Sequence, residues 1–198
     1  MSYVIVGLGN PGEAYAATRH NTGRIILEAL AKKAHLEFSV DKKKNALVAR
    51  GTWNGNDVLC IAPNTFMNRS GDSVKQSVKN SSQAKRLIVI HDDLDLPLGV
   101  LKISYNRGSG GHRGVESIIK AIKTREFIRF RIGISSQTPG GKLKKPSGER
   151  AVEKHIIGKF KPTELATLQK VAQVVQAAVE RIMRDPVAGL ARAMTEYN

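Results

Sequence analysis

The segment Leu87–His91 (LIVIH), followed directly by Asp92–Pro97 (DDLDLP), decides the fold class of this chain. An apolar run that lasts until its final histidine is typical of a central strand covered by helices on both faces. Further strand-like runs occur at Tyr3–Gly7, Val100–Tyr105 and Phe127–Ile134, and helical patterns separate them. Strands that alternate with helices predict an α/β fold.

A hairpin makes the predicted sheet mixed. The runs Ala46–Thr52 and Val58–Pro63 flank Asn54-Gly55, a strong signal for a tight turn between antiparallel strands. The length of 198 residues fits one domain. We therefore expect residues 1–198 to form a single-domain three-layer α/β/α fold with a mixed, mostly parallel sheet.

Apolar residues at helical spacing predict helices over 23–34, 70–80, 115–122 and 163–197. Asn21 or Thr22 is the expected cap of the first helix and Ser70 of the second. The C-terminal region should contain two helices, the last with Pro186 at its first position. Residues 136–148 are rich in glycine, proline and lysine and are expected to form a mobile basic loop.

The composition narrows the function classes. The chain carries 32 Lys+Arg against 17 Asp+Glu, a net charge of +15 that favours a polyanionic partner, nucleic acid first. An anionic membrane surface or a merely soluble basic surface are the alternatives. The single cysteine, Cys60, lies in an apolar run and is expected to be a buried thiol. No apolar run is long enough to cross a membrane and the N-terminus lacks signal-peptide features, so we expect a cytoplasmic protein.

The segment Gly7–Gly12 (GLGNPG) matches the glycine pattern of dinucleotide-binding folds. That pattern requires a helix to begin within it, whereas residues 13–21 show no apolar periodicity. We therefore interpret Pro11-Gly12 as a turn and keep a dinucleotide-dependent oxidoreductase only as a distant alternative. A loop directly after a strand is nevertheless where α/β folds place ligands.

His20 and the aspartates after Leu87–His91 are the candidate acid–base residues. A carboxylate that orients an imidazole and stabilises its charged form makes it a general base. The alternatives are turn formation by the aspartates and a metal site, which the absence of zinc-like ligand spacing disfavours.

Two further segments are weaker signals. Residues 64–71 (NTFMNRSG) place amides beside an aromatic residue and either bind a substrate or only cap a helix. Residues 108–114 (GSGGHRG) form a glycine-rich start to a helix, where backbone N–H groups can approach an anion.

Together these segments resemble bacterial-type peptidyl-tRNA hydrolases along nearly the whole chain. The matching stretches are VGLGNPG at 6–12, YAATRHN at 15–21, FMNRSG at 66–71, HDDLDLP at 91–97, GGHRG at 110–114 and FRIGI at 130–134. The resemblance implies a monomeric enzyme without metal or cofactor. It would cleave the ester that joins a peptide to the 3′-terminal ribose of tRNA, with the acceptor arm and the attached peptide as partners.

The resemblance also implies roles for individual residues. His20 would be the general base that activates water, and Asp92 would orient it. Asn10 would help to distinguish N-blocked peptidyl-tRNA from free aminoacyl-tRNA. The remaining substrate-binding residues would be Asn68, which positions substrate and water, and Tyr15 and Phe66, which line the site.

One position departs from the family pattern, because Arg113 stands where the glycine-rich turn usually has asparagine. We expect Arg113 to bind a tRNA phosphate. The other candidates for phosphate contacts are Lys102, Arg107, Arg131, Lys142, Lys144 and Lys145. The main alternative function is that of a non-catalytic RNA-binding relative of the family.

Overall fold

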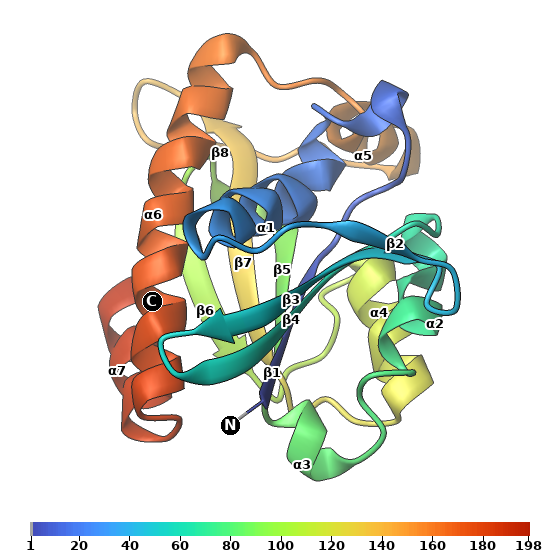
Figure 1. The fold of residues 1–198 in the computed structure, drawn as a ribbon. Coiled ribbons are helices and arrows are strands. Elements are labelled where there is room, and N and C mark those ends of the chain that lie inside the picture. Colours follow the sequence, from blue (N-terminus) through green and yellow to red (C-terminus); the bar gives the residue numbers. More distant parts are fainter. Residues whose placement is uncertain (1) are drawn as a thin grey trace.

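The computed structural model describes residues 2–198, and a single mixed sheet runs through its centre (Figure 1). The strand order is β2-β3-β4-β1-β5-β7-β6, and β8 pairs with β7. The strands are β1 (Ser2–Gly7), β2 (Ser39–Asp41), β3 (Ala46–Trp53), β4 (Asn56–Pro63), β5 (Leu87–Pro97), β6 (Leu101–Tyr105), β7 (Ile128–Gln137) and β8 (Leu143–Lys144).

The neighbouring strands β4, β1, β5 and β7 are parallel, and antiparallel strands flank them. The pairings orient β1, β2, β4, β5 and β7 in one direction and β3, β6 and β8 in the other. The run Leu87–His91 lies in β5, between β1 and β7, and is buried. The predicted mixed, mostly parallel sheet is therefore confirmed.

Helices cover both faces of the sheet (Figure 1). One face carries α1 (Thr22–Lys33), α6 (Pro162–Arg184) and α7 (Ala188–Tyr197), and the other carries α2 (Ser70–Val74), α3 (Ser81–Ala84) and α4 (Arg113–Ile122). Successive side chains of β1 point to opposite faces of the sheet and therefore belong to two separate core clusters. Tyr3 and Ile5 pack in the cluster that includes α1 and α6, and Val4 and Val6 pack with α2 and α4.

The remaining elements are α5 (Glu149–Ile156) and three short 3₁₀ helices, η1 (Glu13–Tyr15), η2 (Arg19–Asn21) and η3 (Met67–Arg69). The first α-helix after β1 begins only at Thr22, and the chain bends at Gly12, whose φ is 97°, so no α-helix begins within Gly7–Gly12. Within residues 2–198, no helix is both long and apolar enough to span a membrane. Cys60 is buried as predicted, and burial raises the pKa of its thiol to about 12.

Two predicted helices have different bounds in the structure. The helix expected over 70–80 ends at Val74, and a second one, α3, begins after Asn80, whose side chain accepts the N–H of Gln83. The last helix does not begin at Pro186. The Asp185 side chain accepts the N–H groups of Val187 and Ala188, so the helix begins after this turn.

The segment 136–148 contains more regular secondary structure than predicted. Strand β7 continues to Gln137, and Ser136 and Gln137 pair with Lys144 and Leu143 of β8. The segment is thus largely a β-hairpin rather than an irregular loop, and its mobility stays a prediction.

A close contact between α1 and the sheet positions the site. A Cβ atom at Gly23 would lie 2.1 Å from the carbonyl oxygen of Ile90, so only glycine allows the helix to begin this close to β5. The turn η2 precedes α1 and is therefore held against the C-terminal end of β5.

Candidate active site

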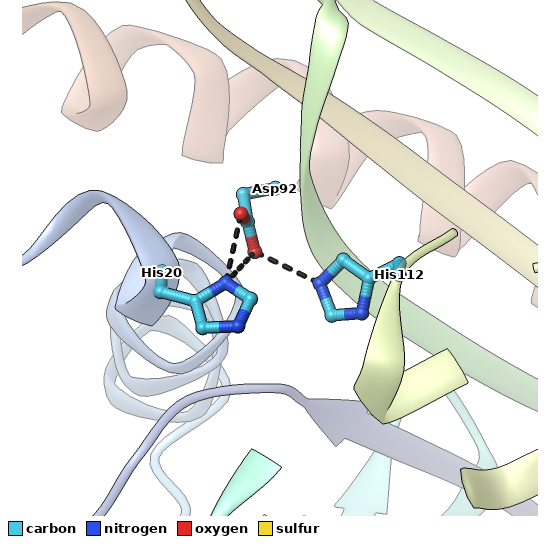
Figure 2. A group of neighbouring side chains, drawn as sticks. All are labelled: His20, Asp92 and His112. Atoms are coloured by element: carbon cyan, nitrogen blue, oxygen red, sulfur yellow. Dashed lines mark hydrogen bonds and ion pairs between the residues drawn. The ribbon is translucent and has the colours of Figure 1, made fainter. Parts of the chain in front are cut away.

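His20 and Asp92 meet at this contact. His20 lies on η2, and its Nδ1 is 2.9 and 3.0 Å from the two carboxylate oxygens of Asp92 on β5 (Figure 2). The two residues are only 8% and 4% exposed. A carboxylate accepts hydrogen bonds, so Nδ1 carries the proton and Nε2 keeps its lone pair. Among residues 2–198 Nε2 has no hydrogen-bond partner, which leaves it available as a base.

A second imidazole binds the same carboxylate. His112 Nε2 lies 3.0 Å from Asp92 Oδ1, and its Nδ1 accepts the N–H groups of Gly114 and Val115 at 3.1 and 3.3 Å (Figure 2). His112 thus caps α4 through Nδ1, and it must donate to Asp92 through Nε2. The sequence analysis did not assign His112 to the site, although its place at the start of a predicted helix was a signal.

The buried pair shifts the pKa values of both partners. Burial alone would raise the pKa of Asp92, but the charges and hydrogen bonds of His20 and His112 hold it well below its ordinary value. Burial alone would lower the pKa of His20, as does the nearby Arg113, but the charge and hydrogen bond of Asp92 raise it above its ordinary value. Asp92 is therefore a charged partner that stabilises protonated His20.

His20, Asp92 and His112 are also the one group in the described chain whose ligand atoms are close enough to suggest a metal site, within 4.8 Å of one another. The hydrogen bonds of His112 oppose this interpretation. Because its Nδ1 accepts two backbone N–H groups, Nε2 carries the proton and could ligate a cation only as an imidazolate. The cluster fits a hydrogen-bonded acid–base site better than a metal site.

Asn10 is held in a fixed orientation beside this cluster. The side chain of Asn21 accepts the backbone N–H of Asn10 at 2.8 Å and donates to its carbonyl oxygen at 2.9 Å. Asn21 occupies the N-cap position of α1, as predicted, but its side chain makes no capping bond because this amide binds Asn10 instead. Thr22 does not cap α1 either, since its hydroxyl donates to the carbonyl of Arg19. Asn10 Oδ1 accepts the N–H of Met67 at 2.9 Å, so its Nδ2 remains to donate to a ligand.

These groups line one cavity of about 650 Å³. Asn10, His20, Asp92 and Asn68 all contribute to its wall, and Phe66 stands at its edge with 63% of its surface exposed. Tyr15 is the exception. It lies half-buried on η1 and is not among the residues that line the cavity.

Comparison with known proteins decides the family. Residues 4–198 match the family model described as peptidyl-tRNA hydrolase. The chain belongs to the peptidyl-tRNA hydrolase family. Curated peptidyl-tRNA hydrolases from Alkaliphilus oremlandii and Thermodesulfovibrio yellowstonii are each 39% identical to it, over 99% and 98% of both chains respectively.

A crystal structure of peptidyl-tRNA hydrolase from Acinetobacter baumannii has the same fold. It matches with a TM-score of 0.86 and 33% identity, over 99% of this chain and 95% of that one. The resemblance found in the sequence is therefore confirmed for both family and fold.

Arg113, which departs from the usual peptidyl-tRNA hydrolase pattern, lines the mouth of the cavity. Its Nη2 lies 2.9 Å from Glu149 Oε1 on α5, and both side chains are largely exposed. Exposed ion pairs are weak. Arg113 can therefore exchange Glu149 for another anion at little energetic cost.

A second, basic cleft of about 470 Å³ lies beside the first. Its wall contains the predicted residues Lys102, Arg107 and Arg131 and also Arg129, which was not predicted. Two carboxylates, Asp93 and Asp95, line it as well. Arg129 is 4% exposed, and no residue in the described chain hydrogen-bonds or ion-pairs with its guanidinium group. Burial, followed by the charge of Arg131, lowers its pKa to about 10.

The other predicted phosphate contacts lie on the 136–148 hairpin. Lys142 and Lys144 are exposed, and Lys145 forms an ion pair with Asp95. Arg131 is also paired, with its Nε 2.7 Å from Asp93 Oδ2. Arg129 is thus the buried cation of this region whose charge is least compensated.

Proposed function

We propose that this protein hydrolyses the ester between the peptide and the 3′-terminal ribose of peptidyl-tRNA, releasing tRNA for reuse in translation. Family membership supports the reaction. The observation that carries the chemistry is the bond from His20 Nδ1 to Asp92, because it leaves the Nε2 lone pair free at the cavity.

His20 acts as general base in this reaction. Its Nε2 takes a proton from water while the water oxygen bonds to the ester carbonyl carbon. Asp92 stabilises the imidazolium that forms. When the bond from carbon to the ribose oxygen breaks, the imidazolium returns the proton to that oxygen, so His20 is regenerated with free tRNA and free peptide.

Amide groups complete the site. The free Nδ2 of Asn10 and the side chain of Asn68 are the donors available for the peptide and for the negative charge that develops on the carbonyl oxygen. Phe66 offers the peptide an apolar contact at the edge of the cavity. Tyr15 lies outside the cavity wall, so the proposed reaction assigns it no contact with the reacting groups.

The basic cleft binds phosphates of the tRNA acceptor arm. The Arg129 guanidinium is buried and has no ion-pair partner among residues 2–198, and the nearby Asp93 carboxylate is already paired with Arg131. Flanked by Lys102 and Arg107, it favours an anionic ligand. The site is complete within a single copy of the chain, which supports a monomer, and a role in translation supports a cytoplasmic location.

Hydrolysis of an N-acetyl-aminoacyl-tRNA, compared with the same tRNA carrying a free aminoacyl group, tests this function. With EDTA present, we expect rapid release of N-acetyl-amino acid and little hydrolysis of the unblocked form. Binding of tRNA without cleavage of either form would instead identify the protein as a non-catalytic RNA-binding relative.

The affinity for tRNA should fall steeply with salt. Each neutralised phosphate contributes about −0.7 to −0.9 to the slope of log K against log[salt]. Binding titrations at several salt concentrations measure this slope. Lys102→Ala and Arg107→Ala should each reduce it by about one contact, whereas Lys33→Ala, an exposed control on α1, should not. A slope near zero in the native protein would show that the +15 charge does not serve tRNA binding.

Replacement of Arg113 by asparagine should raise KM and flatten the salt slope of tRNA binding by about one contact, with kcat retained. The guanidinium can form a bidentate pair with a phosphate, which an amide cannot match in charge. Steady-state kinetics at two salt concentrations check this.

Arg50→Asn is the matched control for this substitution, because Arg50 is also exposed and paired with a carboxylate but lies outside the cavity. Unchanged KM and salt response in Arg113→Asn would show that the side chain only faces solvent. A loss confined to kcat would place it in the chemical step.

A further inference from the structure

We propose that His91 is a positioning residue for the hydrolytic site: it fixes the Asp92 peptide and the His112 ring without touching substrate. The inference rests on the function proposed above, since it assigns His91 a part in that reaction. His91 borders the cavity but is only 1% exposed, so its ring is covered by its neighbours. Neither the roles implied by the family resemblance nor the proposed mechanism accounts for it.

The end of strand β1 creates the need for such a residue. Pairing of β1 with β5 ends at Gly7 and Ile90, and the last backbone bond there runs from Leu8 N–H to the carbonyl of Ile90. Carbonyl groups two residues apart in a strand point to the same side. The carbonyl of Asp92 therefore points to the side where β1 no longer offers a donor.

His91 supplies the missing donor. Its Nδ1 lies 2.7 Å from the carbonyl oxygen of Asp92, so Nδ1 carries the proton. This bond holds the Asp92 carbonyl directly beyond the end of the β1–β5 ladder, while β7 still pairs with β5 on the other side. The Asp92 carboxylate extends from the same residue, and its two imidazole partners depend on that position.

The His91 ring also supports His112. The two rings meet edge to face at 68°, with centroids 4.7 Å apart. Besides His112, the titratable or charged groups that act on His91 are Asp92 and Arg129. Burial, followed by the nearby His112, keeps the pKa of His91 well below its ordinary value, so the ring is a neutral donor. Its buried Nε2 has no partner in the described chain, so the polar contact that the ring makes is through Nδ1.

Three substitutions distinguish the role of His91 Nδ1 from the roles of Nε2 and of the ring. In His91→Asn the side-chain amide nitrogen can replace Nδ1, in His91→Gln it can replace only Nε2, and His91→Phe keeps a ring without any donor. Two readouts apply: the titration of the His20 imidazole by NMR in the free protein, and kcat and KM on N-acetyl-aminoacyl-tRNA.

We expect the Phe and Gln variants to lower kcat by about 10- to 100-fold with KM nearly unchanged, because a small displacement of catalytic groups is costly. In both, His20 should titrate at lower pH, because Asp92 raises its pKa against the opposing charge of Arg113. The His112 ring also faces His20, with the ring centroids 5.1 Å apart. His91→Asn should restore most of both properties.

The proposal would be overturned if His91→Asn lost as much kcat as His91→Phe and His91→Gln. It would also be overturned if His91→Phe left both kcat and the His20 titration unchanged. If the Phe variant does not fold, the comparison of Asn with Gln gives the same decision. The NMR titration needs no tRNA, so it tests the positioning role even if the native protein fails to hydrolyse peptidyl-tRNA.

Discussion

Replacement of His20 by alanine should lower kcat by about 10²–10⁴-fold while leaving tRNA affinity close to that of the native protein. The reason is geometric, because Nε2 of this ring is the free base at the cavity. The phosphate-binding groups stay intact, because Lys102, Arg107 and Arg129 line the neighbouring basic cleft and Arg113 stands at the cavity mouth. Single-turnover hydrolysis and a tRNA-binding titration measure the two quantities independently.

His20→Asn sharpens this test. Its amide nitrogen can still donate to Asp92 in place of Nδ1, yet it offers no base in place of Nε2. We expect it to be as inactive as His20→Ala, whereas His35→Ala, at an exposed histidine, should have native activity. Retention of a tenth or more of the native rate in either His20 variant would show that His20 is not the base.

Replacement of Asp92 by asparagine should be nearly as damaging as loss of His20. The carboxylate accepts from two imidazoles, but an amide has only one acceptor oxygen. His112 must donate through Nε2, because its Nδ1 caps α4. The amide oxygen therefore serves His112, and its NH₂ group faces His20. His20 then places its proton on Nε2 and loses the lone pair at the cavity.

The pH profile distinguishes this effect from simple unfolding. Asp92 raises the pKa of His20, so Asp92→Asn should move the acid limb of kcat/KM to lower pH as it lowers the maximum. The profile of a folded Asp92→Asn protein measures both changes. Native kcat with an unmoved limb would exclude Asp92 as the partner of the base.

Strong local patterns made much of the fold predictable. The apolar run in β5 and the Asn54-Gly55 turn identified the central strand and the hairpin, because each signal lies within a few residues of the element that it specifies. The long apolar stripe of α6 did the same for the C-terminal helix. Composition and periodicity suffice where an element buries a regular face.

Helices and turns that bury no regular apolar face could not be predicted from the sequence. Helix α5 has no buried residue and directly follows a segment rich in glycine and proline, and its apolar pattern is limited to Val152 and Ile156, four positions apart. The 3₁₀ turn η2 shows no periodicity, although it carries His20. Short turns are defined by backbone bonds and contacts that sequence spacing does not encode.

The sequence indicated which residues belong to the site, but not all of the hydrogen bonds that join them. His20 and Asp92 were paired from the family resemblance. The second bond from His112 to Asp92 and the use of Asn21 to hold Asn10 depend on contacts between distant segments. Arg129 was missed because a single arginine in a strand pattern is ordinarily exposed. Only the tertiary structure shows that its strand is buried there.

The most direct test is a comparison of two curves for the native protein: kcat/KM on N-acetyl-aminoacyl-tRNA against pH, and the NMR titration of the His20 imidazole. If His20 bound to Asp92 is the base, activity should be lost as pH falls through the His20 pKa, and both midpoints should coincide above the ordinary value for histidine. An acid limb that does not follow the His20 titration would contradict the assignment of His20 as the base.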